Sequence, residues 1–347
     1  MNENAPTLKD VAARAGVGKA AVSAALRGSL TGTRVSEATR KRILHAAAEL
    51  RYSPNIIARG LKNQRLNLLG VTFDYPDPTW IVEDNYGINM LKGIIGGAHN
   101  SGYSTTLFHK PWDDAKNSAT GFRGQGIDGF LVVAPGYRSD MVPGLAALGI
   151  PLVVISSSSD QYGVPSVAVD NMKGVRLVLN HLRSLGHRRI AHLTDSISQF
   201  DWVMRRETFL AMAEEAGIQV PPDYARYLTN AHRDRGFYHH VRYLMSLPEP
   251  PTAIFATNDS VAMEALDAAR DLGLDVPGQL SIVGFDDDRE GRRTTPPLTS
   301  VRYAMVEMGQ TAAKLLIALI EGEDVPAVTH LFEPELVVRE STAPPSK

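Results

Sequence analysis

The first apolar pattern of the chain predicts a short amphipathic helix near the N-terminus. Residues at i, i+3, i+4 and i+7 form one buried helical face, and they are Leu8, Val11, Ala12 and Ala15. Thr7, followed three residues later by Asp10, is typical of a helix start. The Gly-Val-Gly sequence at residues 16–18 then predicts a turn. This stretch therefore indicates a helix over residues 8–15 that ends in a glycine turn.

A second and a third helix follow within the first fifty residues. The pattern predicts a helix over residues 19–27, with Val22 and Leu26 facing inward. The side chains expected to face outward are Lys19, Ala20, Ser23, Ala24 and Arg27. After a loop at residues 28–34, Ser36 predicts the cap of a third helix. The apolar residues that this helix should direct toward the same core are Ile43, Leu44, Ala47 and Leu50. Two helices around a glycine turn indicate a helix-turn-helix, whose second helix enters the DNA major groove.

From residue 66 onward the pattern changes to short apolar runs that alternate with helix-length segments. The runs predicted as buried parallel strands are residues 68–73, 129–133, 151–155, 189–193, 253–256 and 280–285. Strands that alternate with helices are typical of open α/β sheets, because parallel strands need a crossover connection. The fold class expected is an all-α DNA-binding domain followed by an α/β domain.

The charge distribution separates the same two parts. Residues 1–65 hold twelve Lys and Arg against four Asp and Glu, a net charge of +8 that leaves −10 for residues 66–347. Neutralisation of phosphates supplies most sequence-independent DNA affinity, so the basic segment favours a DNA partner. The chain has no cysteine, which excludes disulfides and thiolate metal sites. We find no signal-peptide pattern and no apolar run of about 18 residues, so we expect a cytoplasmic protein without a membrane span.

Polar side chains follow several predicted strands. They are Asp74, Ser156, Asn258, Asp259 and Asp286. Ligands of parallel sheets bind at the carboxyl ends of the strands, where these side chains would meet. Asn and Asp after a strand also commonly cap the next helix, and this alternative stays open for Asn258 and Asp259.

The N-terminal motifs carry a resemblance to a known family. The motifs are Thr-Leu-Lys-Asp-Val-Ala at residues 7–12, Ala-Gly-Val at 15–17, Val-Ser at 22–23, Val-Ser-Glu-Ala-Thr-Arg at 35–40 and Tyr-Ser-Pro-Asn at 52–55 with Ala58 and Leu61. Together they closely resemble the LacI/GalR family of bacterial transcription regulators. The resemblance extends over essentially the whole chain and implies two subdomains around a cleft, as in periplasmic sugar-binding proteins.

The resemblance also implies which residues meet DNA. The segment after Pro54 corresponds to a hinge helix that folds in the minor groove, where Leu61 of each subunit wedges into a base step. Lys19 and Ala20 take the positions that choose operator bases. The full set of expected DNA contacts is Thr7, Lys19, Ala20, Ser23, Ala24, Arg27, Arg34, Asn55, Ala58, Arg59, Leu61 and Lys62. Because few of the reading-helix side chains form hydrogen bonds, we expect specificity to depend also on DNA deformability.

For the cleft, the resemblance implies a small-molecule effector, most commonly a sugar. Asn258 and Asp286 match effector contacts, and Arg205 matches an arginine that grips the ligand. The effector-binding residues expected are Phe73, Asp74, Ser156, Trp202, Arg205, Asn258 and Asp286. Aromatic side chains that are candidates for stacking are Phe73, Trp80, Tyr86, Phe200 and Trp202, with core packing favoured for Phe73.

The expected domain organisation has four parts. Residues 1–52 form the DNA-binding domain, 53–65 the hinge, 66–341 the effector and dimerisation domain, and 342–347 a tail. Within the effector domain we expect one subdomain from residues 66–167 and 298–330, and the other from 168–297 and 331–341. The resemblance places the chain crossings between them near residues 167–170, 297–299 and 331–335.

The function expected is that of a transcription regulator, because the N-terminal segment carries both the helix-turn-helix pattern and the positive charge. A repressor would bind a palindromic operator as a homodimer, with its affinity controlled by the effector. The alternative is a solute-binding protein for a sugar transporter, which the missing export signal and the basic head disfavour. No phosphate loop, dinucleotide fingerprint or nucleophile elbow is present, so we expect neither an enzyme nor a cofactor. Asp286, Asp287 and Asp288 are expected to meet solvent rather than a metal.

Overall fold

A computed structural model describes residues 6–27, 35–52, 65–75, 79–83, 85–108, 112–122, 126–194, 199–227 and 236–346. The chain divides into two compact units, Met1–Leu66 and Asn67–Lys347, which are described separately. Residues 53–64 of the predicted hinge, among them Asn55, Ala58, Arg59, Leu61 and Lys62, lie outside the described residues, as does Arg34.

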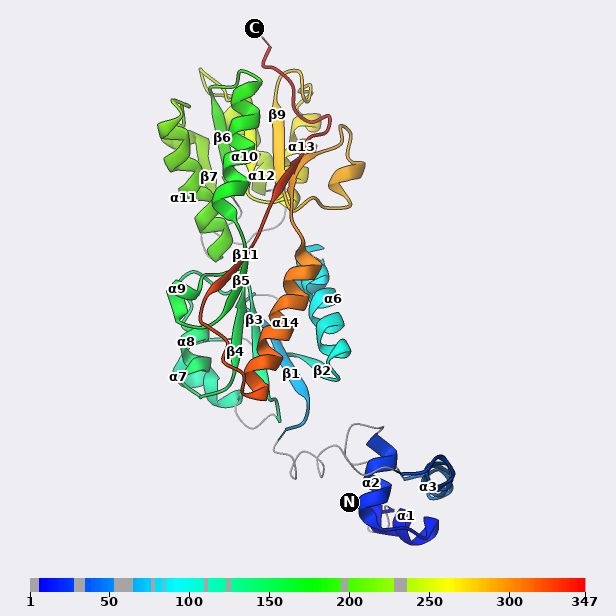
Figure 1. Ribbon diagram of the computed structural model, residues 1–347. Helices are drawn as coiled ribbons and strands as arrows, with labels where there is room; N and C mark the ends of the chain where they lie inside the picture. Colours follow the sequence, from blue (N-terminus) through cyan, green and yellow to red (C-terminus); the bar gives the residue numbers. More distant parts are fainter. Residues whose placement is uncertain are drawn as a thin grey trace. The chain divides into compact units, whose positions relative to one another are not determined.

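The smaller unit contains α1 (Leu8–Ala15), α2 (Lys19–Arg27) and α3 (Glu37–Glu49), at the bounds that the pattern indicates (Figure 1). The carboxylate of Asp10 accepts hydrogen bonds from the backbone N–H and the hydroxyl of Thr7, each at 2.7 Å. Gly16 ends α1 with φ +64°, a left-handed conformation that glycine adopts without a Cβ clash. The side chain of Ser36 accepts from the N–H of Thr39 and caps α3. Local sequence signals therefore fix the ends of these helices.

The core of this unit corrects two expectations. Val11, Val22 and Ile43 are fully buried, in agreement with the pattern. Leu44 is 45% exposed, so the prediction that it faces the core is wrong, and Ala46 is buried instead. Ala24 is only 8% exposed, so the prediction that it faces outward is also wrong. In α3 the buried face follows Ile43, Ala46 and Ala47, which leaves Leu44 beside it, whereas α2 buries a wider face that includes Ala24.

Within the described residues, the larger unit contains two six-stranded sheets. The first has the order β11-β5-β4-β3-β1-β2, and the second β12-β10-β9-β8-β6-β7. The strands of the first sheet are β1 (Leu68–Phe73), β2 (Ser104–Phe108), β3 (Gly129–Val133), β4 (Leu152–Ile155), β5 (Ser166–Val169) and β11 (Thr329–Phe332). Those of the second are β6 (Ile190–Thr194), β7 (Ala225–Tyr227), β8 (Ala253–Ala256), β9 (Ser281–Phe285), β10 (Thr299–Arg302) and β12 (Glu335–Val337).

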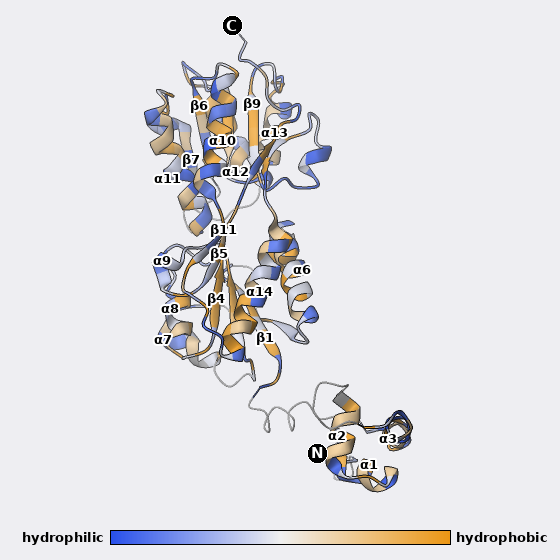
Figure 2. Ribbon diagram, in the orientation of Figure 1, coloured by the Kyte–Doolittle hydropathy of each residue, from blue (hydrophilic) through white to orange (hydrophobic). Residues whose placement is uncertain are grey.

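Helices connect the strands (Figure 1). Those of the first subdomain are α5 (Trp80–Glu83), α6 (Asn85–Asn100), α7 (Ala115–Ser118), α8 (Met141–Ala146), α9 (Ser159–Tyr162) and α14 (Met305–Glu321). Those of the second are α10 (Asn171–Ser184), α11 (Phe200–Glu215), α12 (Gly236–Met245) and α13 (Asp259–Asp271). The central strands are hydrophobic, as Figure 2 shows for both sheets, because helices cover them. No helix in the described ranges is long and apolar enough to cross a membrane.

The six apolar runs predicted as strands all form strands, and their pairs with neighbouring strands are parallel. The pattern missed the other six, which are short or lie toward the sheet edges. β10 pairs in parallel with β9 through Thr299 and Val283 and therefore belongs to the second sheet. β12 is antiparallel to β10.

The position of β10 changes one expected crossing. The chain leaves the second sheet after Arg302 and enters α14 at Met305, so this crossing lies at residues 303–304 and the expectation of 297–299 is wrong. The Pro296-Pro297 pair suggests a boundary, yet the β-branched residues after it continue into a strand. The other crossings lie between β5 and α10 and between β11 and β12, as expected.

The C-terminal segment is bound to the second subdomain rather than free. Ser341 is fully buried, and its carbonyl accepts from the N–H of Ile282 at 2.9 Å. His187 Nε2 lies 2.9 Å from the carbonyl of Ala343 and donates to it, since a carbonyl only accepts. Residues 341–346 therefore extend the packing of the second sheet beyond the expected limit of residue 341.

Close helix packing in the first subdomain depends on glycine. A Cβ at Gly93 in α6 would lie 2.1 Å from the carbonyl oxygen of Val306 in α14, whereas one at Gly96 would meet only the side chain of Gln310 at 3.7 Å. Two helices approach this closely only where one of them has no side chain.

We therefore expect Gly93→Ala to lower the free energy of unfolding by about 1–3 kcal/mol, because the helices must move apart. Gly96→Ala is the matched control on the same helix. It should be neutral or stabilising by up to about 1 kcal/mol through helix propensity. Urea unfolding measures both, and equal stabilities of the two variants would contradict the close contact.

Candidate functional site

The described residues of the small unit place the expected reading helix at its surface. Lys19 and Ala20 at the start of α2 are exposed, and Ser23 is half-buried. Thr7 before α1 is exposed. Ala24 is buried, so it has little surface to offer to a base, and Arg27 is the last residue of α2. Exposed basic residues Arg40, Lys41 and Arg42 on α3 add positive charge to the unit.

The larger unit holds a pocket between the two sheets, at the carboxyl ends of their strands. About 400 Å³ of non-atom space lies within its outline, a volume that includes open solvent. Its lining residues are Tyr75, Tyr86, Ala134, Ser156, Gln199, Phe200, Asp201, Trp202, Arg205, Asn258, Asp286 and Tyr303. Five of the seven expected effector residues line it, namely Ser156, Trp202, Arg205, Asn258 and Asp286. Parallel topology explains why residues so distant in sequence meet, because it brings the carboxyl ends of the strands to one edge.

Arg205 is the central charge of this pocket. Its side chain from α11 is 3% exposed, and its guanidinium carbon lies 3.6 Å from the ring centroid of Phe285. Nε donates to Asn171 Oδ1 at 2.9 Å and Nη1 to the carbonyl of Thr257 at 2.7 Å. Burial opposes its charge, but Asp286 and other nearby groups raise the pKa of Arg205 above its ordinary value. The guanidinium therefore stays charged and its plane is held by three elements.

Asp286 compensates this charge. Its Oδ1 lies 3.6 Å from Nη1 of Arg205 and accepts from the hydroxyl of Tyr303 at 2.9 Å. Burial, together with the charge of Asp286, raises the pKa of Tyr303 well above its ordinary value, so Tyr303 remains a neutral donor. Asp286 has φ +115°, an uncommon conformation outside glycine that costs about 1–3 kcal/mol unless its surroundings enforce it.

Asn258 and Ser156 show how strand ends supply both structure and pocket surface. The side chain of Asn258 accepts from the N–H of Val261 at 2.9 Å and caps α13, while it also lines the pocket. Ser156 has φ +60°, and its Oγ lies 2.5 Å from the hydroxyl oxygen of Tyr86. The two interpretations of Asn258, as a helix cap and as a pocket residue, are therefore compatible.

Two expected effector residues do not line this pocket. Phe73 is 6% exposed and belongs to the hydrophobic core, with its ring 5.4 Å from that of Tyr75. Asp74 accepts from the N–H of Gly136 at 2.9 Å and lines a neighbouring open pocket. β1 ends at Phe73 as expected, but the first side chain of this segment that lines the pocket is that of Tyr75, two residues after the strand. Of the other aromatic candidates, Tyr86 and Phe200 line the pocket, and the side chain of Trp80 lies outside the described residues.

Sequence reasoning missed Tyr75, Ala134, Gln199, Asp201 and Tyr303. Tyr303 follows β10, so recognition of that strand would have identified it by the same strand-end rule. Asp201 accepts from Nδ2 of Asn171 at 2.7 Å, a contact over thirty residues that no local pattern indicates. In the described part of the chain, no group of three or more His, Asp or Glu side chains is placed to hold a metal ion.

Behind the pocket lies another acidic residue, Asp259, which is 1% exposed. Its Oδ1 accepts from the hydroxyl of Ser300 and its Oδ2 from the N–H of Asp288, both at 2.6 Å. Burial, followed by the negative charges of Asp288 and Asp287, raises the pKa of Asp259 to about 7 against these hydrogen bonds. Asp259 therefore ties α13 and β10 to the loop that carries Asp286.

We expect this carboxyl to make stability depend on pH. An unfolded Asp titrates near pH 3.9, so between about pH 4 and 7 the native state binds more protons and stability falls as pH rises, by up to about 1.4 kcal/mol per unit. Asp259→Asn mimics the protonated acid and should remove this slope. Urea unfolding from pH 5 to 8 measures it, with Asp267→Asn on the exposed face of α13 as control. Parallel profiles for wild type and Asp259→Asn would contradict the assignment.

Comparison with known proteins identifies both units. A family model described as bacterial regulatory proteins, lacI family, matches residues 7–55. A model of the periplasmic binding protein-like domain matches residues 179–342. The chain is 30% identical to the HTH-type transcriptional repressor CytR of Escherichia coli (strain K12), over 98% of this chain and 97% of CytR. It is 29% identical to the HTH-type transcriptional regulator RegA of Clostridium saccharobutylicum, over 97% of this chain and 99% of RegA.

Solved structures show the same likeness over both units. The Lac repressor dimer bound to operator and the anti-inducer ONPF has a TM-score of 0.84 at 26% identity, covering 98% of this chain and 100% of the other. The complex of the transcriptional regulator CelR with cellobiose has a TM-score of 0.70 at 27% identity, covering 97% and 99%. These similarities span the helix-turn-helix unit and the two-sheet unit together. The chain belongs to the lacI family of bacterial regulatory proteins and is a DNA-binding transcriptional regulator, not an enzyme.

Proposed function

We propose that this regulator is a repressor that binds a palindromic operator as a homodimer, with its affinity controlled by a neutral sugar in the pocket. The single observation that carries the effector part is the convergence of Arg205, Asp286 and Asn258 with aromatic side chains in one pocket. In this proposal residues 1–52 read the DNA, residues 53–65 form the hinge and the two-sheet unit binds the effector.

The pocket favours a hydroxyl-rich ligand without negative charge. The charge of Arg205 is already compensated by Asp286, and Asp201 adds a further carboxylate. The formal charges of the lining residues therefore sum to about −1. This charge would repel a sugar phosphate or an acid in a partly desolvated site. Carboxylate oxygens of Asp286 and Asp201 accept hydrogen bonds from hydroxyls, which fits a polyol.

Aromatic side chains supply the apolar part of such a site. Tyr75, Tyr86, Phe200 and Trp202 line the pocket together with Tyr303. A sugar ring presents C–H groups on its faces and hydroxyls at its edge, so it matches a pocket in which aromatic surface surrounds a few polar groups. Cellobiose in CelR is a sugar bound by a structural relative.

The operator part of the proposal rests on the small unit. Exposed Lys19 and Ala20 begin α2, where a recognition helix presents side chains to base edges. One such helix reads few base pairs, so a two-fold dimer on a palindrome doubles the contacts. A dimer seated on its operator in the cytoplasm would block transcription.

Selection of bound duplexes from a random pool tests this part. The full-length chain should enrich a palindrome at physiological salt. Lys19→Ala should relax the preference at the base it reads, at a cost of about 1–3 kcal/mol. The control, Lys41→Ala on α3, should weaken binding to all sequences alike because it removes a phosphate partner. An enriched site without two-fold symmetry would contradict the dimer, and unchanged preferences with Lys19→Ala would contradict the reading role of α2.

The effector part is tested at Arg205. Arg205→Gln should leave binding to the selected duplex intact and weaken the response to a neutral sugar by about 10- to 100-fold, since charge-assisted hydrogen bonds are lost. A panel of glucose, galactose, ribose and cellobiose, read by thermal shift and by duplex binding, supplies the probe. Arg206→Gln is the control, because the neighbouring Arg206 pairs with Glu207 and does not line the pocket. An undiminished response in Arg205→Gln would assign effector binding elsewhere.

A further inference from the structure

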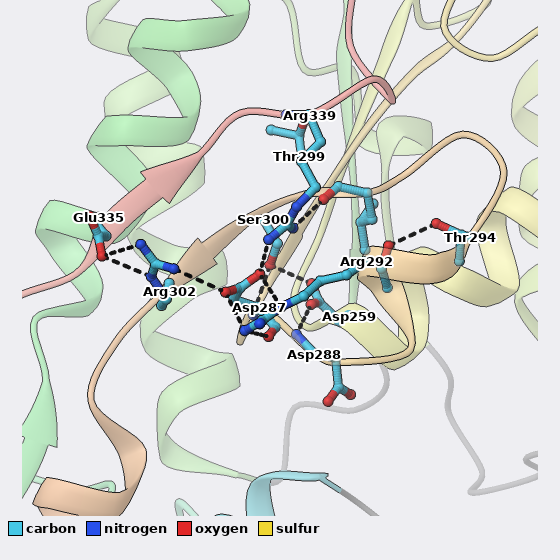
Figure 3. Close-up of polar contacts among 12 residues, drawn as sticks. Asp259, Asp287, Asp288, Arg292, Thr294, Thr299, Ser300, Arg302, Glu335 and Arg339 are labelled. Carbon is cyan, nitrogen blue, oxygen red and sulfur yellow. Dashed lines mark hydrogen bonds and ion pairs between the residues drawn. The ribbon is translucent and has the colours of Figure 1, made fainter.

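Asp287 follows the pocket residue Asp286 directly, but it takes part in a separate cluster of charges. Its side chain is 1% exposed, so the expectation that it meets solvent is wrong. Oδ2 accepts from Nη2 of Arg292 at 2.7 Å, and Oδ1 accepts from Nη2 of Arg339. Figure 3 shows the Asp287 carboxylate between these arginines. A buried carboxylate that accepts from two guanidiniums is held firmly, because each of them donates a charge-assisted hydrogen bond to it.

Arg302 links this cluster to the chain crossings. It is the last residue of β10, directly before the crossing at residues 303–304, and its Nη1 lies 3.8 Å from Oδ2 of Asp287. The opposite side of the same guanidinium donates through Nε and Nη2 to Oε1 of Glu335, both at 2.8 Å (Figure 3). Glu335 begins β12, directly after another crossing. One guanidinium therefore bridges the cluster and the far side of a second crossing.

Arg339 adds a second link from the same strand pair. It follows β12, its Nη1 donates to the carbonyl of Leu298 at 2.6 Å, and its N–H donates to Thr299 Oγ1 at 2.9 Å. Arg292, by contrast, lies in the loop between β9 and β10 and contacts Asp287 alone among the members of the cluster. Arg302 and Arg339 therefore lie on or beside the strands that flank the crossings, whereas Arg292 lies in the same loop as Asp287.

The backbone of this loop needs external support. Asp286 and Asp287 have φ +115° and +51°, both in the left-handed region. The N–H of Asp286 donates to the carbonyl of Val301 at 2.7 Å, and that of Asp287 to Ser300 Oγ at 3.0 Å. These bonds join the loop to β10 on the inner side, and the Asp287 carboxylate joins it to Arg302 and Arg339 on the outer side. Support from both sides keeps an uncommon conformation in place.

We propose that Asp287 is a positioning residue that fixes Asp286 in the pocket and couples it, through Arg302 and Arg339, to two of the three crossings between the subdomains. A ligand hydroxyl bound at Asp286 would then bias the arrangement of β10 and β12, the strands that flank these crossings. This inference rests on the proposed function, in which Asp286 meets the effector. In this inference the buried carboxylate of Asp287 transmits the effect of ligand binding at Asp286 to the crossings.

Hydrogen exchange of the full-length chain without any small molecule tests the coupling. Arg302→Gln should raise exchange in peptides covering residues 284–290 and 333–340 together, by at least about tenfold. Arg292→Gln, the matched control, removes an arginine from the same carboxylate but should raise exchange in residues 284–294 alone. Arg302→Lys keeps the charge but cannot bridge two carboxylates, so it should behave like Arg302→Gln. Asp287→Asn should loosen both segments.

Two localised patterns of exchange would overturn the proposal. One is exchange in Arg302→Gln that changes in residues 299–304 alone, and the other is an equal rise in both segments with Arg292→Gln. If Asp287→Asn does not fold, the arginine variants still decide the matter. A rise spread evenly over β8 and β9 would mean general destabilisation and would also contradict a specific coupling.

A second measurement follows the functional consequence. From the panel of glucose, galactose, ribose and cellobiose, the sugar with the largest thermal shift in wild type is the probe. Arg302→Gln should retain that shift but lose most of the change in duplex binding, because Arg302 does not line the pocket. Loss of both in equal proportion would contradict a positioning role. Failure of every sugar to bind the wild type would reject the sugar assignment, while the exchange data would still test the cluster.

Discussion

A buried guanidinium must be compensated, and much of the two-sheet unit is arranged around that requirement at Arg205. Its partners come from separate elements: Asn171 begins α10, Thr257 follows β8 and Asp286 follows β9. Phe285 covers the face of its planar group. A cation in this position is stable only if these elements keep their places, since removal of one partner leaves charge in a region of low polarity. The network that holds Arg205 in the pocket therefore also joins α10 to the ends of β8 and β9.

Parallel topology determines where such a network can form. The strands of both sheets end at the same cleft, so polar residues at several strand ends meet although they are far apart in sequence. The same strand ends also begin helices, and Asn258 serves the cap of α13 and the pocket at once. This dual use explains why helix capping and ligand binding are difficult to separate by residue type. It also explains why Asp259, one residue later, is buried behind the pocket rather than in it.

The crossings between the subdomains concentrate charged contacts. Lys173 pairs with Glu333 across the first and third crossings, and Arg302 pairs with Glu335 beside the second and third. These pairs are partly exposed, so each contributes little to stability alone. Their place beside the crossings gives them a different importance, because any change of angle between the subdomains must occur there. The Asp287 cluster shares Arg302 with the second of these pairs and directly follows the pocket residue Asp286 in sequence.

The sequence by itself determined the features that depend on local chemistry. The three N-terminal helices, their caps at Thr7 and Ser36, the turn at Gly16 and six of the strands follow from periodicity and from residues with one favoured backbone conformation. Five of the expected pocket residues followed from the strand-end rule together with the family resemblance. The tertiary structure alone decided which side of a strand end faces the cleft, so Tyr75 replaced Phe73 and Asp74. It also decided that Thr299–Arg302 is a strand. It decided that Ala24 is buried and Leu44 exposed. Finally, it brought arginines from three segments of the chain into contact with Asp287. The physical reason is that burial and charge compensation depend on partners brought from distant parts of the chain, which no local pattern specifies.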